Sequence, residues 1–336
     1  MNYDGVKVLV TGADGFIGSH LTEKLVDRGG KVTALCLYNS FDQFGWIDDL
    51  HESVRAKLRL VRGDVRDSAF VRRIVRGQDI VFHLAALIAI PHSYITPQSY
   101  VETNVLGTLN VLEAARESGV ARIVHTSTSE VYGTAVTMPI AESHPLQGQS
   151  PYSASKVGAD MMAEAFARSF KLPVAILRPF NTFGPRQSER AVIPAIVRQA
   201  LDPTCPAMFV GDTTPMRDFT FVEDTADAFM ATGIMPNIQF GRPYNAGSGN
   251  AVTIMDIINL VTRLTNCNKP VVQRESDRMR PADSEVGALL ADSSRLSADT
   301  GWRATIDLRE GMKRTIAWWR SRLAGGLVRR EATFIT

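Results

Sequence analysis

Cysteine is scarce in this sequence, with only Cys36, Cys205 and Cys267 among 336 residues. Three widely spaced cysteines exclude a disulfide framework, and none of them falls in the short, paired spacing of a structural zinc site. We therefore predict no metal site. The same cysteine usage fits a reducing compartment and favours a cytoplasmic location.

The sequence also lacks an excess of charge of either sign. Its 37 basic and 35 acidic side chains give a formal net charge of +2, which argues against a nucleic acid or a membrane bound through bulk electrostatics. No apolar run resembles a signal peptide or is long enough to span a membrane. A chain of this length can bury a sizeable core, in one large domain or in two smaller ones.

A glycine-rich turn near the N-terminus is the first positive signal. A short apolar strand ends at Thr11, the sequence Gly-Ala-Asp-Gly-Phe-Ile-Gly follows, and an amphipathic helix is predicted from about Ser19 to Asp27. Strand, glycine turn and helix together are typical of dinucleotide binding, and the alternative is a purely structural turn. The glycines allow a tight turn, close approach of a pyrophosphate and close helix packing. The predicted cofactor residues are Gly12, Gly15, Phe16, Ile17 and Gly18.

The second predicted strand, residues 32–37, lacks the acid that usually binds the adenosine ribose near its end. Cys36 occupies that position, and the next acid is Asp42. No arginine or lysine follows closely to hold a 2′-phosphate either. We expect NAD as the cofactor, with NADP still possible, and Asn39 and Ser40 as ribose ligands for either one.

Further cofactor ligands are expected after the third and fourth strands. Asp64 is placed to accept a hydrogen bond from an adenine amino group, with Val65 against the ring, although a helix cap is the plainer role for Asp64. The small residues after the fourth strand let the backbone lie close to the cofactor. Asn104 begins a predicted helix to Ser118 and is expected to bind irregular backbone. The remaining candidates are Leu84, Ala85, Ala86, Asn104, Thr126 and Pro179.

The most informative stretch runs from a buried strand at 123–126 to a helix that begins after Ser150. Ser150 is a predicted N-cap, and the helix is expected to extend to about Phe170. Tyr152 and Lys156 are four residues apart on it and share a face. An ammonium beside a phenol lowers the phenol's pKa, so Tyr152 is a plausible proton acceptor. Thr128 could hold the substrate hydroxyl from which Tyr152 takes a proton. The alternative for Tyr152 and Lys156 is an ordinary surface pair without a catalytic role.

Strands alternate with helices up to about residue 186, which predicts an α/β fold with a doubly wound parallel sheet of the Rossmann type. Beyond that point prolines and short motifs replace the alternation, and we predict a smaller α/β substrate-binding lid domain. We expect the dinucleotide-binding domain to comprise residues 1–186 and a returning segment at about 219–246. The nucleotide-sugar-binding domain is expected to comprise residues 187–218 and 247–322, and residues 323–336 a loosely held tail.

The motifs TGADGFIG, HLAA, TSTSEVYG, YSASK, RPFNTFGPRQ, RDFTFVED, NAGS and RPAD resemble those of the extended short-chain dehydrogenase/reductases that act on nucleotide sugars. The resemblance covers Lys7 to about Trp319. It implies a bound nicotinamide dinucleotide and an NDP-hexose that is oxidised transiently at carbon 4. The triplet Thr128-Ser129-Glu130 is similar to that of the 4,6-dehydratases, which carry an acid two residues after the catalytic threonine. The 4-epimerases usually lack this acid. The surrounding sequence looks most like the LegB-type dehydratases of legionaminic acid biosynthesis, which act on UDP- or GDP-N-acetylglucosamine.

The resemblance also implies the chemistry. Tyr152, assisted by Thr128 and Lys156, takes the proton of the 4-hydroxyl as hydride leaves carbon 4. Glu130 takes the proton from carbon 5, and water leaves carbon 6 with a proton from Glu130 or through Ser129. Three alternatives remain: a 4-epimerase, a 5,6-dehydratase and a non-catalytic dinucleotide sensor. Ser129 in place of an aspartate leaves the 5,6-dehydratase open, whereas the Tyr–Lys pair argues against the sensor.

Substrate contacts are expected from both halves of the chain. Two arginines, Arg217 and Arg280, are natural ligands for a diphosphate, and the apolar loop from Leu87 to Tyr94 either lines the sugar pocket or is a buried loop. The candidate substrate residues are Ile88, His92, Asn181, Val192, Arg217, Asn245, Arg280 and Asp283.

We also expect a homodimer. The predicted helices 104–118 and 151–170 carry apolar residues on more than one face, and the resembled family pairs these helices into a four-helix bundle. The residues behind this expectation are Met161, Met162, Ala165 and Phe166.

Overall fold

The computed structural model describes residues 1–273 and 286–328. Its centre is a sheet of seven parallel strands in the order β10-β6-β5-β4-β1-β2-β3. This arrangement confirms the predicted doubly wound fold class. The strands are β1 (Lys7–Thr11), β2 (Lys31–Leu37), β3 (Arg59–Gly63), β4 (Ile80–His83), β5 (Arg122–Thr126), β6 (Val174–Pro179) and β10 (Pro243–Ala246).

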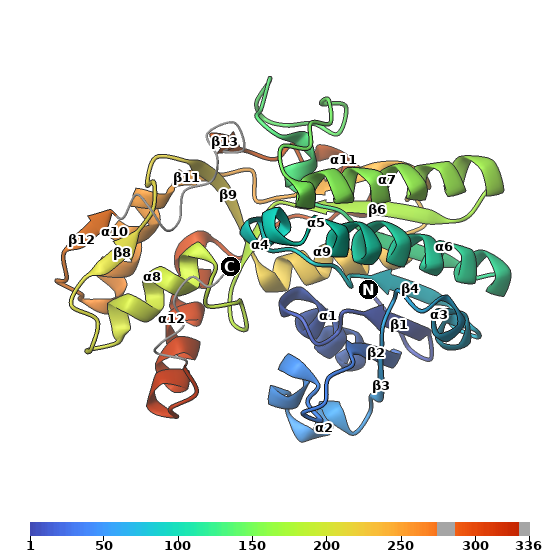
Figure 1. The fold of residues 1–336 in the computed structure, drawn as a ribbon, viewed down its shortest axis with the longest axis horizontal. Helices are drawn as coiled ribbons and strands as arrows, with labels where there is room; N and C mark the ends of the chain where they lie inside the picture. The colour runs from blue at the N-terminus through green and yellow to red at the C-terminus, as the bar shows by residue number, and fades with distance from the viewer. Residues whose placement is uncertain (274–285, 329–336) are drawn as a thin grey trace.

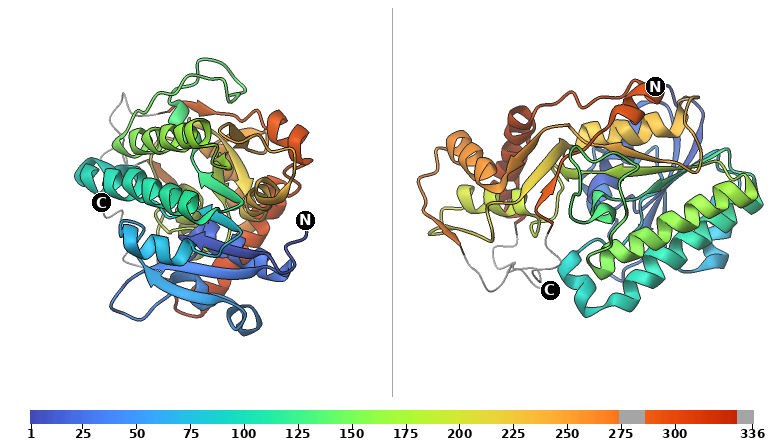
Figure 2. Two further views of the ribbon diagram at one scale, coloured as in Figure 1. Left: turned by 90° about the vertical axis from the view of Figure 1, so that its right-hand side faces the viewer. Right: turned by 90° about the horizontal axis from the view of Figure 1, so that it is seen from above.

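Helices cover both faces of this sheet (Figures 1 and 2). On one face α1 (Phe16–Asp27) packs against α9 (Val222–Ile234). On the other face lie α3 (Ser68–Val75), α6 (Gly107–Ser118) and α7 (Pro151–Phe170). Both faces of the sheet are packed against helices, so side chains on either face of a strand are buried. The strands are therefore nearly continuous apolar runs, as expected for a parallel sheet buried on both sides. Within the described ranges, no helix has the length and apolar character that a membrane crossing requires.

A second, smaller assembly lies to one side of the large sheet (Figure 1). Its central strand β9 (Met216–Phe221) pairs with β7 (Asn181–Phe183), β11 (Ala251–Thr253) and β13 (Ala288–Leu289), and β8 (Met208–Val210) pairs with β12 (Val271–Gln273). The helices α8 (Val192–Leu201), α10 (Ile254–Thr265) and α12 (Leu308–Ala324) share its apolar core, which includes Ile196, Ile257 and Trp319. The predicted domain boundaries stay a prediction.

Short helical elements lie in the connections between these strands and helices. They are η1 (Gly45–Asp49), α2 (Glu52–Arg55), α4 (Ile90–Ile95), α5 (Pro97–Tyr100), η2 (Val101–Leu106), η3 (Ser129–Tyr132) and α11 (Ser294–Thr300). The helix expected from Asn104 begins as a π-helix, η2, and becomes α-helical only at Gly107. The buried Asn104 amide binds the loop after β4 within this turn, and π-helical turns often occur at functional sites.

The helix α7 begins and ends where the sequence predicts. Ser150 caps it: its side chain accepts from the backbone N–H of Ser153, and the Ser153 hydroxyl accepts from the backbone N–H of Ser150, which forms a reciprocal capping box. Pro151 occupies the first helical position. This start is well defined because a serine cap satisfies an otherwise unpaired N–H and proline needs none there. It therefore fixes the position of Tyr152, one residue further on.

Candidate active site

The carboxyl end of β5, between β4 and β6, carries the predicted catalytic triplet. Thr128 caps η3 and accepts a hydrogen bond from the Glu130 N–H at 3.2 Å. Thr128 and Glu130 both act on the Tyr152 phenol: the Thr128 side chain lowers its pKa and the charge of Glu130 raises it. The structure thus brings Thr128, Glu130 and Tyr152 together, while Ser129 between them is buried.

The electrostatics of the Tyr–Lys pair differ from the expectation. Burial raises the pKa of Tyr152, and the hydrogen bond with Thr128 opposes this only in part. Burial lowers the pKa of Lys156 to about 8, and the charge of Asp160 opposes that. Lys156 Nζ donates to the Thr126 carbonyl at 2.6 Å. The predicted lowering of the phenol's pKa is therefore wrong for the protein alone, because desolvation and nearby negative charge raise that pKa more than Thr128 lowers it.

The apolar loop after β4 covers the phenol ring. Ile90 and Tyr100 form a buried cluster with Tyr152, and the two tyrosine rings meet edge to face at 6.3 Å between centroids. The two predicted roles of this loop are divided between its residues, since Ile90 is buried whereas Ile88 is 67% exposed. His92, on α4, shares a hydrogen bond with Thr96 through its Nε2 at 3.1 Å.

A buried polar chain behind the catalytic residues was not anticipated from the sequence. Asp160 is fully buried and accepts from Arg178 Nε at 3.1 Å and Nη2 at 2.9 Å. Arg178 Nη1 donates to the Tyr132 hydroxyl at 2.9 Å, which donates to Asn245 Oδ1 at 2.7 Å. The chain ties α7 to β6 and η3. Its signal in the sequence was Asp160 itself, one helical turn after Lys156 on the same face.

Charge balance explains why this chain tolerates burial. Although burial raises it, the hydrogen bond from His125 and the charge of Arg178 hold the pKa of Asp160 below its usual range. A buried ion pair of this kind is stable only when its remaining hydrogen-bonding groups are also satisfied. Ser127 supplies one such bond to Asp160 at 2.7 Å. Asn245, predicted to bind substrate, is fully buried here, and its amide also donates to the Ile140 carbonyl.

The glycine turn at the start of α1 fits a dinucleotide. Gly15 is the N-cap of α1 and is exposed. Because glycine has no side chain, the backbone N–H groups of the first turn receive no side-chain cap. A Cβ added to Gly15 would meet only Gly12 O within 4 Å, whereas one added to Gly12 would lie 2.8 Å from Ala85 N. One side of the turn is therefore closed against the β4 loop and the other is open. Open backbone N–H groups at a helix start are a favourable site for a diphosphate, and Phe16 and Ile17 follow in its first turn.

Several other predicted cofactor residues lie at the same edge of the sheet. The N–H groups of Leu84 and Ala85 donate to Thr11 Oγ1, and Ala86 continues this loop. Thr126 Oγ1 is buried and has no hydrogen-bond partner among the described residues, which leaves it for a ligand. Pro179 ends the buried strand β6. Among the residues that the structure describes, no cluster of three or more His, Cys, Asp or Glu could hold a metal ion.

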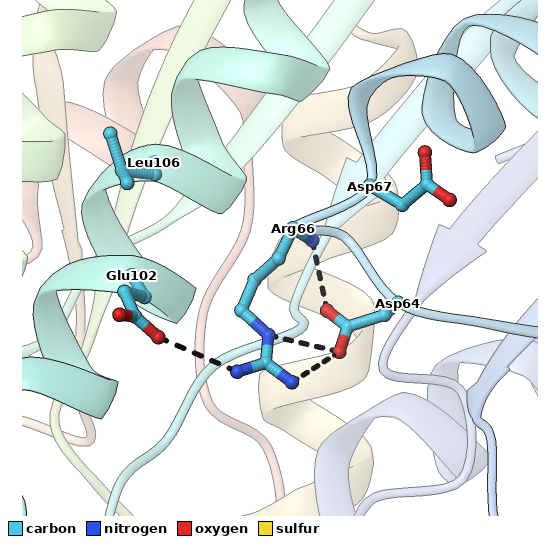
Figure 3. Close-up of a pocket in the computed structure, with 5 residues that line it drawn as sticks. All are labelled: Asp64, Arg66, Asp67, Glu102 and Leu106. Atoms are coloured by element: carbon cyan, nitrogen blue, oxygen red, sulfur yellow. Dashed lines mark hydrogen bonds and ion pairs between the residues drawn. The ribbon is translucent and has the colours of Figure 1, made fainter.

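Asp64 lines an open pocket of about 520 Å³, together with Arg66, Asp67, Glu102 and Leu106 (Figure 3). Its carboxylate accepts from Arg66 Nε at 2.9 Å and Nη2 at 2.6 Å, and Arg66 also faces Glu102 at 3.6 Å (Figure 3). The hydrogen bonds from Arg66 lower the pKa of Asp64. Asp67, rather than Asp64, caps α3. Val65 is buried beside Gly107, and adenine binding here stays a prediction.

The ribose end of β2 holds an arginine that the sequence interpretation missed. Register between the parallel strands β2 and β3 places Arg62 opposite Cys36, and Arg62 Nη2 pairs with Asp42 at 2.6 Å. The inference that no basic residue lies near this position was therefore wrong, since it considered only residues close in sequence. Asn39 donates to the Gln43 carbonyl and accepts from the Phe41 N–H, so it shapes its own loop. Ser40 is exposed.

Three of the predicted substrate residues lie in the small assembly. Asn181 Oδ1, in β7, is buried and has no hydrogen-bond partner within the described part of the chain, which suits a ligand contact. Val192 begins α8. Arg217 is only 7% exposed and donates to the carbonyls of Met216 and Gly287. Arg280 and Asp283 lie outside the described residues, so the two-arginine diphosphate site stays a prediction.

Comparison with known proteins places this geometry in a family. A family model described as GDP-mannose 4,6 dehydratase matches residues 9–315. The chain is 31% identical to a dTDP-glucose 4,6-dehydratase of Actinoplanes sp., covering 94% of this chain and 98% of that protein.

Two solved structures are similar over the full fold. One is UDP-N-acetylglucosamine 4-epimerase from Methanobrevibacter ruminantium M1 in complex with UDP-N-acetylmuramic acid, with 30% identity, a TM-score of 0.85, and coverage of 95% of this chain and 99% of that one. The other is DesIV, a dTDP-glucose 4,6-dehydratase from Streptomyces venezuelae with NAD and TYD bound, with 29% identity, a TM-score of 0.83, and coverage of 95% and 98%. This similarity supports NAD as the cofactor. With its glycine turn, Thr–Tyr–Lys geometry and sheet order, the chain belongs to the extended short-chain dehydrogenase/reductase family of GDP-mannose 4,6 dehydratase and related nucleotide-sugar 4,6-dehydratases and 4-epimerases.

Proposed function

We propose that the protein is an NAD-dependent nucleotide-sugar 4,6-dehydratase, a hydro-lyase that converts an NDP-N-acetylhexosamine to its 4-keto-6-deoxy derivative. The observation that carries the proposal is the position of Glu130. It follows Thr128 by two residues, on η3, and its charge acts on the Tyr152 phenol. A second proton acceptor beside the Tyr–Thr pair is what elimination requires and what simple oxidation at carbon 4 does not.

The first chemical task is removal of the 4-hydroxyl proton. The Thr128 side chain is close enough to Tyr152 to lower its pKa, so a sugar hydroxyl placed between the two meets both an acceptor and a donor. The phenol must lose its proton to act as a base, and a nearby positive charge lowers the pKa that burial raises. Lys156, one helical turn away, supplies such a charge below pH 8. NAD, when bound, supplies the acceptor for the carbon-4 hydride and returns it, so the reaction needs no added oxidant.

The second task is elimination of water across carbons 5 and 6. A ketone at carbon 4 acidifies the hydrogen on carbon 5, and a positioned carboxylate such as Glu130 can accept it. The leaving 6-hydroxyl then requires a proton, which Glu130 itself now carries. The resulting alkene would become the 4-keto-6-deoxy sugar when the hydride taken from carbon 4 is returned to carbon 6 and a solvent-derived proton enters carbon 5. The fixed N-cap bond of Thr128 and the buried chain through Tyr132 hold η3, and so hold Glu130, against the sheet.

Two other reactions use the same first step. A 4-epimerase needs no second base, and Glu130 argues against it, although a 4-epimerase is among the similar structures. A 5,6-dehydratase would return hydride to carbon 4 and leave an exocyclic alkene, and Ser129 in place of an aspartate is the feature that favours it. The sugar product separates all three reactions.

The proposed substrate is UDP- or GDP-N-acetylglucosamine, as for the LegB-type enzymes that make precursors of legionaminic acid and surface polysaccharides. The sequence around LIAIPHSY and HPLQGQSPYSASK supports it, as does a similar structure named for UDP-N-acetylglucosamine. The test is incubation with each nucleotide sugar and identification of the product by NMR. A 4-keto-6-deoxy product supports the proposal, whereas an unchanged carbon 6 with an inverted carbon 4 contradicts it.

We also propose that the enzyme is a cytoplasmic homodimer formed through η2, α6 and α7. These helices contact one another, and their outer surface exposes Val101, Leu106, Met161 and Phe170, with Met161 43% exposed. Of the residues named from sequence, Phe166 instead lies in the core. Light scattering at micromolar concentration should give a dimer mass, and Met161→Glu should lower it; a monomeric wild type would contradict the assembly. All three cysteines are free, which fits a reducing cytoplasm.

A further inference from the structure

The end of β2 lacks the acid that usually recognises the adenosine ribose. Cys36 stands there, and its side chain is fully buried in an apolar cluster with Ala34, Ile47 and Leu50. A buried thiol in such a place is a weak hydrogen-bond donor and carries no charge, and burial raises its pKa to about 12. Position 36 therefore contributes neither a strong acceptor for a ribose diol nor repulsion of a 2′-phosphate.

A carboxylate from another segment reaches the same end of the strand. Asp14, inside the glycine turn, accepts a hydrogen bond through Oδ2 from the backbone N–H of Leu37, the residue that follows Cys36, at 3.0 Å. The charge of Asp14 also acts on the Cys36 thiol, which confirms that the two side chains are close. Asp14 is half-buried rather than enclosed. A carboxylate accepts about four hydrogen bonds, so the bond from Leu37 leaves acceptor capacity for a ligand.

The surrounding backbone holds Asp14 in this orientation. Its carbonyl accepts from the Trp46 N–H at 3.1 Å, and the neighbouring Ala13 N–H donates to the Leu35 carbonyl at 3.1 Å. Gly45 has a φ of +56°, and a Cβ there would lie 2.7 Å from the Asp14 carbonyl oxygen. The glycine turn, β2 and the loop at residue 45 therefore all fix one residue. A preorganised acceptor of this kind loses little entropy when a ligand binds.

Other charges in this region are already paired. Arg62, opposite Cys36, forms an ion pair with the exposed Asp42 at 2.6 Å and stacks on Phe44 at 3.8 Å. Asp48 accepts from the Phe44 N–H at 2.7 Å. Of these acids, Asp14 is the one that lies within the dinucleotide-binding turn itself, one residue before the Gly15 cap of α1.

We propose that Asp14 is the ribose-recognising carboxylate of this enzyme, taking the role that the missing acid at position 36 would have, and that it makes the enzyme select NAD over NADP. A diol of the adenosine ribose donates to the Asp14 carboxylate in charge-assisted hydrogen bonds. A phosphate on the same ribose would bring a second anion against a fixed carboxylate that is partly removed from water, where like charges repel strongly. This inference rests on NAD being the cofactor, as in the proposed function.

The test is equilibrium binding of NADH and NADPH to the purified full-length protein after removal of bound nucleotide, followed by nicotinamide fluorescence. Asp14→Asn keeps an oxygen that can accept from Leu37 N–H and removes the charge. The ratio of the NADPH to the NADH dissociation constant should fall by about 10- to 100-fold, which is the range for loss of one charged hydrogen bond. Asp42→Asn is the matched control, because it removes an acid of the same region without touching the turn, and its ratio should stay near wild type.

The outcomes are distinguishable. If wild type fails to bind NADH, the cofactor assignment fails, and both the proposed function and this inference fall with it. If wild type binds NADH selectively and Asp14→Asn keeps that selectivity while melting at the wild-type temperature, only this inference is overturned. A loss of selectivity in Asp42→Asn but not in Asp14→Asn would also overturn it, because the Arg62–Asp42 pair would then read the 2′ position.

Discussion

Two regions at the carboxyl edge of the large sheet, each proposed to contact a ligand, are built in different ways. At the end of β5, the groups proposed to act on the sugar come from one segment, from Thr126 to Lys156, and are ordered by one strand and one capped helix. At the end of β2, the charged groups come from three segments, represented by Asp14, Asp42 and Arg62. The first region follows its family's pattern except at Ser129, which stands in place of an aspartate. In the second, the proposed ribose carboxylate comes from another part of the chain.

The difference shows which part of a Rossmann fold is free to vary. Catalysis requires a fixed geometry between a phenol, a hydroxyl and a carboxylate, and a displacement of about 1 Å can cost about 10²-fold in rate. Ribose recognition requires only that some carboxylate reach the diol. Any residue whose backbone passes the end of β2 can supply it, and the glycine turn is the nearest such segment.

The largest effect is expected at the β5 end, from Tyr152→Phe. The ring would keep its packing against Ile90 and Tyr100, but the hydroxyl that bonds Thr128 would be lost. Reduction of the cofactor on mixing with substrate should slow by about 10²–10⁴-fold, the usual cost of losing a positioned acid–base group. Stopped-flow absorbance of the reduced nicotinamide measures it. NADH and NADPH affinities should not change, which separates the two regions; wild-type reduction rates would remove Tyr152 from the mechanism.

The next largest effect concerns the buried support of the β5 end. Asp160→Asn leaves the fully buried Arg178 without its counter-charge, and breaking a buried pair in this way typically costs about 3–5 kcal/mol of folding stability. Glu164→Gln, one helical turn later, breaks an exposed ion pair with Arg168 and should cost no more than about 1 kcal/mol. Urea unfolding of both variants measures the difference. Equal stability losses would contradict the role given to the buried chain.

A substitution at the β2 end tests whether the acid can be restored by sequence analogy. Cys36→Asp puts a carboxylate where the usual pattern has one, but the site is fully buried and lies beside Asp14. The variant should lose roughly 3 kcal/mol of folding stability, because an unpaired charge in such a place is poorly solvated, and Cys36→Ser should lose less. Thermal unfolding checks both. A stable Cys36→Asp variant that rejects NADPH more strongly would show that position 36 faces the ribose after all.

The smallest effect is a pH dependence of folding stability from Lys156. Its pKa falls from the ordinary 10.5 to about 8 on burial, so between these values the unfolded chain binds more protons than the folded one. Stability therefore rises with pH in this window. Relative to Lys156→Met, the wild type should gain about 1 kcal/mol in free energy of unfolding between pH 7 and pH 9. Denaturant titrations of the nucleotide-free proteins measure it, and a pH-independent difference would contradict a buried, titrating amine.

The sequence predicted the elements and residues whose signals are local. The strand at β1, the Ser150 cap and the Tyr152–Lys156 pair depend on neighbours within one turn or one strand, and all are found where expected. Side chains that meet through strand pairing were not predictable. Arg62 reaches Cys36 only because β2 and β3 are adjacent and in register.

Desolvation was the other physical effect that residue spacing could not give. The pKa of Tyr152 is raised mainly by burial of the phenol, to which the loop after β4 contributes, and the spacing of Tyr152 and Lys156 gave no sign of that burial. Asn245 shows the same limit. Its position in a motif suggested a substrate contact, which stays a prediction, and its complete burial with hydrogen bonds to Tyr132 and to backbone was not foreseen.

The central claim, that Glu130 makes this enzyme a dehydratase, is tested most directly by Glu130→Gln. The substitution keeps the size of the side chain and removes the carboxylate, while Tyr152, Thr128 and Lys156 remain. With UDP- or GDP-N-acetylglucosamine the variant should still reduce its cofactor, seen as absorbance of the reduced nicotinamide. Release of dehydrated product and entry of solvent deuterium at carbon 5 should fall by about 10²–10⁴-fold. Dehydration at the wild-type rate in Glu130→Gln would contradict the role assigned to Glu130 and remove the observation that carries the proposed function.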